Sequence, residues 1–307
     1  MESNSIKNYP LNDFQTTSHS ADPQLNDALI GHGLICIREV LPNVAKCISR
    51  AYDGYDQSEI VGLATGFNEL DQLLSGLHPG DLILLAGLPE VGKTTFALNI
   101  AENVGLESNI PVAIFSMDLD STELAMRIVV STGNLNRSNI ETGKIEDKDW
   151  EDIALTFGRL CEAPIYIDEE SGLSSNEISI RARQIQKQCG NLGLIIVDYL
   201  QLMPTNIGRH GESRTEGISE TLRSLKVLAK EIGCTVVVIS ELTRSQAINI
   251  NCTIGSEILE PNFADVVLFL NRNEMYDPSS NDKDVAEIVV AKNRNGSLGC
   301  IRLTCSD

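Results

Sequence analysis

Short apolar runs alternate with helical patterns along the chain from Gly62 onward. In the helical stretches the apolar residues recur at three- and four-residue steps, whereas the runs between them are short and continuous. This alternation predicts an α/β domain with a mostly parallel, buried sheet. The predicted strands are Leu82–Ala86, Val112–Ser116, Ile165–Ile167, Leu194–Val197, Thr235–Ser240 and Val266–Leu270. The predicted helices are Thr94–Asn103, Thr122–Ser131, Asp147–Cys161, Ser175–Cys189 and Ser219–Ile232.

Two later apolar runs, Ala286–Ala291 and Cys300–Thr304, flank the turn-forming pair Asn295-Gly296. An Asn-Gly pair between two strand-like runs is typical of a β-hairpin. We therefore predict a C-terminal hairpin at the end of the α/β domain.

The chain before this domain has a different pattern. Residues 1–28 are rich in Asn, Ser, Asp and Gln and are expected to form a disordered polar tail. Residues 29–60 contain apolar positions at helical spacing and are interpreted as an amphipathic helix with its connector; residues 61–307 then form the α/β domain. Because so short a helix is marginal alone, its apolar face needs a partner in its own domain or in a neighbouring subunit.

Composition narrows the class of protein. The chain has 307 residues, 42% of them hydrophobic, and a net charge of −19, which argues against broad, non-specific nucleic-acid binding but not against a few local basic contacts. No apolar run is long enough to span a membrane, and the N-terminus has no secretory signal, so a cytoplasmic location is expected. The eight cysteines form no C-x-x-C pair and are expected to be reduced, buried thiols.

The segment Gly87–Thr94 fits the phosphate-loop pattern G-x-x-x-x-G-K-[ST] between a predicted strand and a predicted helix. Glycines let the backbone N–H groups face the phosphates, and the start of the helix adds partial positive charge. Lys93 is expected to reach the β- and γ-phosphates, and the Thr94 hydroxyl to bind magnesium. We therefore predict a site for ATP and Mg²⁺ made of Gly87, Leu88, Pro89, Glu90, Val91, Gly92, Lys93, Thr94 and Thr95.

An acidic residue further along the chain completes the predicted metal site. The apolar run Leu194–Val197 is followed directly by Asp198. A buried strand that ends in a carboxylate beside a phosphate loop is typical of the aspartate that holds magnesium through a water.

Three segments occur in order along the chain: Thr65-Gly66-Phe67-Asn68-Glu69-Leu70-Asp71, Ile114-Phe115-Ser116-Met117-Asp118 and Asp198-Tyr199-Leu200-Gln201-Leu202-Met203. Together with Lys292-Asn293-Arg294-Asn295-Gly296 they closely resemble the motor domain of the bacterial replicative DNA helicase of the DnaB type. The resemblance extends from about Ile37 to Thr304.

The resemblance implies a RecA-like ATPase that assembles as a homohexameric ring. Such a ring moves 5′ to 3′ along single-stranded DNA and separates strands, beside other replication proteins. Ile37–Tyr52 matches the family's linker helix, which docks onto the adjacent subunit. Arg294 matches the arginine finger and Lys292 its neighbour, both acting on the γ-phosphate of the adjacent subunit. Their spacing alone favours a solvated hairpin end, and the family resemblance reverses that interpretation.

DNA contacts in the family come from loops that face the pore. The candidates here are the loop Pro204–Gly217, with Arg209, His210 and Arg214, and the segment after Arg244. Glycines and basic residues suit a loop that follows a phosphate backbone, whereas the lack of aromatic residues argues against base stacking. The alternative is a solvated loop without a ligand.

The chain departs from the family at two positions of the active site. The glutamate that activates the attacking water is Asp118 here, one methylene shorter, which is expected to slow hydrolysis. The glutamine that senses the γ-phosphate is Glu241, whose charge would repel a phosphate. Either Glu241 turns away, is protonated or pairs with a cation such as Arg244, or this site senses nucleotide differently. The family's N-terminal domain also has no counterpart in the first thirty residues.

Two functions remain from the sequence. The first is an ATP-dependent DNA helicase or translocase of the DnaB type, supported by Lys93, Thr94, Asp198, Lys292 and Arg294. The second is a non-motor or weakly hydrolysing ATP-binding paralogue that regulates or assembles with a replication protein. It is supported by Asp118, by Glu241 and by the lack of a counterpart to the family's N-terminal domain. A different RecA-like ATPase, such as a recombination mediator, is disfavoured by the Asp198–Met203 segment.

Overall fold

The computed structural model describes most of the chain from Gly62 to Cys305. The described ranges are 62–204, 214–243, 263–275 and 283–305, with six positions between Ile37 and Ala45. Two compact units divide the chain, Met1–Glu59 and Ile60–Asp307. The predicted polar tail 1–28 lies outside the described residues, as do Arg209, His210 and Arg244.

The first unit contributes part of the predicted amphipathic helix. Its described positions are all helical, which confirms helix within the predicted segment. The side chains of Ile37, Leu41 and Val44 are exposed by 74%, 53% and 43%. Since these residues lie at i, i+4 and i+7, they form one apolar stripe that is open to a partner.

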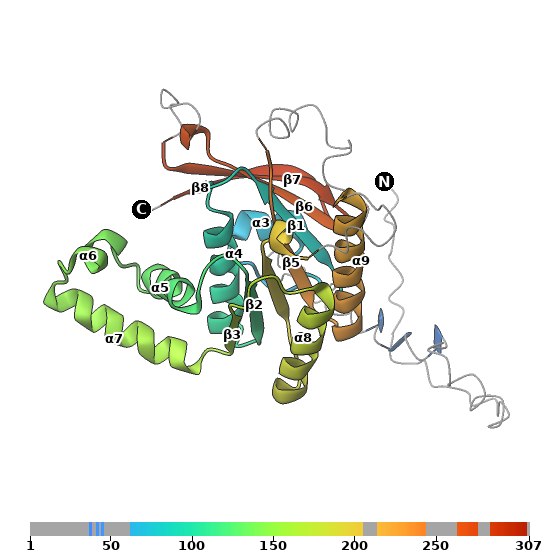
Figure 1. Cartoon of the computed structure of the whole chain (residues 1–307), viewed down its shortest axis with the longest axis horizontal. Helices are drawn as coiled ribbons and strands as arrows, with labels where there is room; N and C mark the ends of the chain where they lie inside the picture. The colour runs from blue at the N-terminus through green and yellow to red at the C-terminus, as the bar shows by residue number, and fades with distance from the viewer. Residues whose placement is uncertain are drawn as a thin grey trace, which may run out of the picture. The chain divides into compact units, whose positions relative to one another are not determined.

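The second unit is built on an eight-stranded sheet with the order β3-β2-β4-β5-β1-β6-β7-β8 (Figure 1). Pairing is parallel from β3 to β6 and antiparallel from β6 to β8, which confirms the mostly parallel sheet and the C-terminal hairpin. The strands are β1 (Leu82–Gly87), β2 (Val112–Ser116), β3 (Ile165–Asp168), β4 (Leu194–Asp198), β5 (Thr235–Glu241), β6 (Val266–Asn271), β7 (Val285–Asn293) and β8 (Gly299–Thr304).

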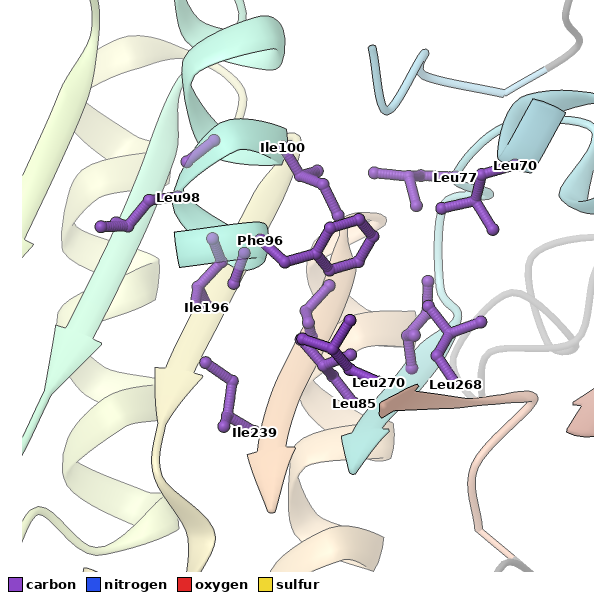
Figure 2. Close-up of a cluster of buried hydrophobic side chains, with 14 of the residues drawn as sticks. Leu70, Leu77, Leu85, Phe96, Leu98, Ile100, Ile196, Ile239, Leu268 and Leu270 are labelled. Atoms are coloured by element: carbon purple, nitrogen blue, oxygen red, sulfur yellow. The ribbon is translucent and has the colours of Figure 1, made fainter. Parts of the chain in front are cut away.

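Helices cover both faces of the sheet. Alternate residues of the central strands point to opposite faces, so each strand contributes to two separate cores. One core packs against α3 (Asn68–Leu74) and α4 (Lys93–Glu102), and Figure 2 shows Phe96 of α4 among leucine and isoleucine side chains of this core. The other packs against α8 (Ser175–Cys189) and α9 (Arg214–Ile232). Burial on both faces explains the continuous apolar runs in the sequence.

A helical extension follows β2. It consists of α5 (Ser121–Thr132), α6 (Arg137–Thr142) and α7 (Asp147–Glu162), at the left in Figure 1. The extension is joined to the core through α5, which packs on both α4 and α7.

The differences from the predicted elements are local. The short helices α3 and α6 were not predicted, because one or two turns give too few apolar repeats to set a period. The end of α4 passes into a π-helical turn, Asn103–Glu107, and short 3₁₀ turns occur at Leu200–Leu202 and Asn273–Met275. Since α9 begins at Arg214, the last residues of the predicted loop Pro204–Gly217 are helical, and that boundary was wrong.

The predicted burial of the cysteines was also partly wrong. Cys234 is buried, but Cys161 and Cys300 are exposed, and Cys189 and Cys305 are half-buried. All five are free thiols. Within the described ranges, no helix is long and apolar enough to cross a membrane, and no group of three metal-binding side chains comes together.

Candidate nucleotide-binding site

The phosphate loop connects β1 to α4, as its sequence predicted. Gly87 ends β1 where the chain passes close to β6, and a Cβ atom there would come within 2.6 Å of the Leu270 carbonyl oxygen. Gly92 directly precedes α4 with a φ of 97°, a conformation that favours glycine. The loop thus turns tightly enough to present the start of α4 to an anion.

Lys93 lies over this loop. Its side chain is only 6% exposed, and its Nζ donates a hydrogen bond to the Leu88 carbonyl oxygen at 2.7 Å. The same Nζ lies 3.5 Å from Oε1 of Glu241. Burial lowers the pKa of Lys93, while the negative charges of Glu241 and Asp198 oppose this shift. Lys93 is therefore a buried cation that lies near two carboxylates, those of Glu241 and Asp198.

The two predicted magnesium ligands lie together. Thr94 Oγ1 donates a hydrogen bond to Asp198 Oδ2 at 2.7 Å, and Asp198 is only 4% exposed. Burial raises the pKa of Asp198, and the charge of Asp118 raises it further. A hydroxyl and a buried carboxylate are the hard oxygen donors that Mg²⁺ prefers, so this pair fits that ion.

Asp118 lies near the same edge of the sheet. It follows β2, whose last residue Ser116 pairs in register with Asp198 of β4. Its side chain is exposed, so it is free to face a substrate. Asp120 instead caps α5 by accepting a hydrogen bond from the Glu123 N–H at 2.8 Å. Asp118 is thus the carboxylate of this turn that is left to face a ligand.

Glu241 ends β5, beside Gly87 of β1. Its backbone is clamped by Gln201, whose Nε2 donates to the Glu241 carbonyl oxygen at 2.9 Å and whose Oε1 accepts from the Glu241 N–H at 3.2 Å. Among the open possibilities for Glu241, the structure therefore shows pairing with a cation, and that cation is Lys93. The expected partner Arg244 lies outside the described residues.

A cavity of about 640 Å³ opens on the other side of the loop, between α4, α5 and strands β6–β8. Val91, Gly92 and Thr95 line its wall toward the loop. Arg127 and Arg137 also line it, and both are paired with Glu123. Its volume lies in the usual range for small-molecule sites, so it is large enough for a nucleoside.

Lys292 and Arg294 lie at the opposite ends of the strands from the loop. Gly87 pairs with Leu270 at the carboxyl end of β6, whereas Asn293, the residue before Arg294, pairs with Val266 at its start. Four residues of strand, about 13 Å, separate these two levels. Arg294 therefore cannot reach the phosphate loop of its own chain.

A buried aspartate holds the Arg294 segment. Asp265 Oδ1 accepts a hydrogen bond from Arg294 Nη1 at 3.2 Å, while the Arg294 guanidinium remains 65% exposed. Asp265 Oδ2 accepts from the Leu82 N–H at 2.9 Å and is also bonded to Lys226. Lys292 Nζ donates to the Ala264 carbonyl oxygen at 2.6 Å.

Of the predicted DNA contacts, only Arg214 is described. It is the first residue of α9 and its side chain is exposed. The roles of Gln201, Arg127 and Asp265 were not predicted from the sequence. Gln201 lies within the Asp198–Met203 segment. The resemblance of that segment to the helicase family was the sequence signal that could have pointed to Gln201.

A strand, a glycine loop and a helix that bring Lys93, Thr94 and Asp198 together on a mostly parallel sheet define a P-loop nucleotide-binding protein with a RecA-like core. The family described as "DnaB-like helicase C terminal domain" matches residues 62–307. The chain belongs to this family.

Two curated relatives are similar over most of the chain. The replicative DNA helicase DnaB of Geobacillus stearothermophilus is 39% identical over 271 residues, which are 85% of this chain and 59% of that protein. The replicative DNA helicase DnaB of Pasteurella multocida is 40% identical over 253 residues, 80% of this chain and 53% of that protein. The chain thus spans somewhat more than half the length of these relatives.

Solved structures agree with this family. One whose title describes an ATPase domain has a TM-score of 0.78 and 28% identity, over 88% of this chain and 95% of that one. A structure of a DnaB-like replicative helicase, whose title also names its interactions with primase, has a TM-score of 0.73 and 29% identity, over 88% of this chain and 65% of that one. Both confirm the predicted RecA-like class.

Proposed function

We propose that this protein is an ATP-dependent DNA helicase of the DnaB type that moves 5′ to 3′ on single-stranded DNA in replication. The main support is the contact between Thr94 and Asp198 beside Lys93, within a chain of the DnaB-like family. Cytoplasmic location and association with other replication proteins follow from the same proposal.

In this proposal, the residues at and beside the phosphate loop have separate roles. Lys93 binds the β- and γ-phosphates, and Thr94 and Asp198 hold Mg²⁺, which neutralises charge on the phosphates. Asp118 accepts the proton of the attacking water, which a carboxylate at this position can do. The nucleoside occupies the cavity between α4 and α5.

The arginine finger comes from a second copy. Arg294 and Lys292 lie at the far ends of the strands from the loop of their own chain, which supports a role on a nucleotide held by a neighbour. A finger of this kind contributes about 10³-fold or more to the rate. We therefore propose a homo-oligomer, a ring hexamer, with ATP at each interface between copies.

DNA would lie against the basic residues near α9 and after β5. Arg214 is exposed at the start of α9, and Arg209 and Arg244 are proposed to act with it. Since the chain is strongly acidic, binding through these few cations should be local and salt-sensitive.

A weakly hydrolysing ATP-binding paralogue is the second candidate. The Lys93–Glu241 ion pair and the short Asp118 side chain favour it. Hydrolysis of Mg-ATP, measured with and without single-stranded DNA, separates the two functions. A helicase should show a rate that DNA stimulates, and Asp118→Glu should raise that rate by up to about 100-fold, because a displacement of about 1 Å in a reacting geometry can cost this much.

Asp118→Asn is the matched control, since an amide keeps the size of the side chain but cannot accept the proton. It should abolish the DNA-stimulated rate. If DNA leaves native hydrolysis unchanged while Asp118→Glu gives a large gain, the helicase proposal fails and the paralogue is supported. If Lys93→Ala binds nucleotide as tightly as the native protein, the site itself is wrong.

A further inference from the structure

Glu241 lies beside Lys93, the residue that is proposed to bind the terminal phosphate. The carboxylate and that phosphate would therefore compete for the same lysine. Its Oε1 is 3.5 Å from Lys93 Nζ, and its side chain remains 36% exposed. Leu88 supplies a second partner of this Nζ, a neutral carbonyl oxygen. Glu241 is therefore the charged partner of the lysine in this structure, and its carboxylate satisfies Lys93 much as a phosphate oxygen would.

The backbone around Glu241 leaves it little freedom to move away. Gln201 binds both its N–H and its carbonyl oxygen, and Gln201 Nε2 also donates to Ser240 Oγ at 2.9 Å. The next residue, Leu242, donates its N–H to the Gly87 carbonyl oxygen at 3.0 Å. Glu241 is thus tied to the phosphate loop on one side and to the Asp198–Met203 segment on the other.

Carboxylates gather at the end of the site where the last phosphate would lie. The cavity that suits a nucleoside is lined by β6 and by α5, whose Arg127 and Arg137 are both paired with Glu123. Asp118, Asp198 and Glu241 lie at the ends of β2, β4 and β5, on the other side of β1 from β6. A nucleotide with its base in the cavity therefore points its last phosphate toward three carboxylates.

We propose that Glu241 sets the nucleotide preference of this site by disfavouring the γ-phosphate, so that ADP is held more strongly relative to ATP than in a site with glutamine at this position. This inference rests on the proposed nucleotide binding. ADP lets Lys93 contact the β-phosphate and keep Glu241, whereas ATP places a second anion against the same lysine. Two like charges at such distances repel by an amount that corresponds to about tenfold or more in affinity.

Dissociation constants for Mg-ADP and for Mg-AMPPNP, a triphosphate analogue that resists hydrolysis, test this preference by calorimetry. The ratio of the two constants in the native protein should favour Mg-ADP by about tenfold more than the ratio in Glu241→Gln. Glu241→Gln should tighten the analogue about tenfold and change Mg-ADP less than about threefold, because only the γ-phosphate meets the removed charge. Glu241→Asp, which keeps the charge on a shorter side chain, should fall between them.

Glu220→Gln is the matched control, because it removes one exposed carboxylate from α9, outside the site. It should change neither constant. If Glu241→Gln leaves the ratio of the two constants as it is in the native protein, or tightens both nucleotides equally, Glu241 does not discriminate and the inference is overturned. If neither nucleotide binds the native protein, the proposed function fails first, which distinguishes the two results.

Discussion

Glu102 is a buried carboxylate on the helix that begins at the phosphate loop. It is 9% exposed, and its Oε2 accepts hydrogen bonds from Ser131 Oγ at 2.9 Å and Thr132 Oγ1 at 3.4 Å. Oε1 has no hydrogen-bond partner among the described residues. Burial is the main cause that raises the pKa of Glu102 from 4.5 to about 7. This single side chain therefore links the α4–α5 contact to pH.

Stability should fall as pH rises through this range. Between pH 4.5 and about 7 the folded protein keeps a proton on Glu102 that the unfolded chain has released, so the free energy of unfolding decreases with increasing pH. The full loss above this range is about 3 kcal/mol. Glu102→Gln should remove most of it and be about 2 kcal/mol more stable than native at pH 8, but not at pH 4.

Urea unfolding followed by circular dichroism at several pH values measures this difference. Glu107→Gln is the control, because Glu107 is exposed and lies at the end of the same helical segment. Parallel stability curves for native protein and Glu102→Gln across pH 4 to 8 would contradict the assignment.

At the residue scale, the sequence predicted what a local motif can specify. Lys93 and Thr94 follow from the loop pattern, and Asp198 follows from an apolar run that ends in an acid. The partner of Glu241 could not be predicted in this way, because it lies 148 residues away and depends on β1 and β5 being neighbours. The role of Asp265 was missed for the same reason, since its partners Leu82, Lys226 and Arg294 are distant in sequence.

At the scale of elements, α7 exposes a stripe of apolar side chains. Trp150 and Phe157 are exposed by 59% and 54%, and Ala154 and Cys161 lie with them at helical spacing. Ile37, Leu41 and Val44 form a comparable exposed stripe. We propose that the Ile37–Val44 stripe of one copy covers the α7 stripe of another, since both expose large apolar side chains.

Phe157→Asp should weaken self-association because it places a charge in this contact. Leu41→Asp should do the same from the other side of the contact. The control is Leu155→Asp: Leu155 is 69% exposed but points about 140° around the helix from Trp150. Sedimentation velocity at several concentrations should show smaller species for the first two variants only. Native-like association of Phe157→Asp would exclude this surface.

Most helices and strands could be predicted because each is long enough for its spacing of apolar residues to be recognised. All eight predicted strands and the five predicted helices of the second unit occur within a few residues of their expected bounds, with the start of α9 the largest difference. The strand order β3-β2-β4-β5-β1-β6 could not be predicted from the pattern, because buried parallel strands have nearly the same composition. Only the family resemblance carried that information.

At the scale of the whole molecule, the proposed site is divided between copies. Lys93→Ala removes the phosphate-binding lysine but keeps the finger, and Arg294→Ala does the reverse. Each variant alone should be inactive. An equal mixture should recover roughly a quarter of the native DNA-stimulated rate, because one interface in four combines an intact loop with an intact finger under random assembly.

Recovery should require exchange of copies between assemblies. Mixing the double variant, Lys93→Ala with Arg294→Ala, with either single variant provides the control, since no interface is then complete. Activity of Arg294→Ala alone at the native rate would contradict the shared site.

The distance between the loop and Arg294 along the sheet bears on whether copies assemble as an open row or as a closed ring. An open row of copies always leaves one loop without a finger at one end and one finger without a loop at the other. Closing the row into a ring removes both defects at once, without any change inside a copy. In the proposed assembly, closure would therefore be the step that gives every copy a complete site, and a ring opened to admit a DNA strand would lack one site for as long as it stays open.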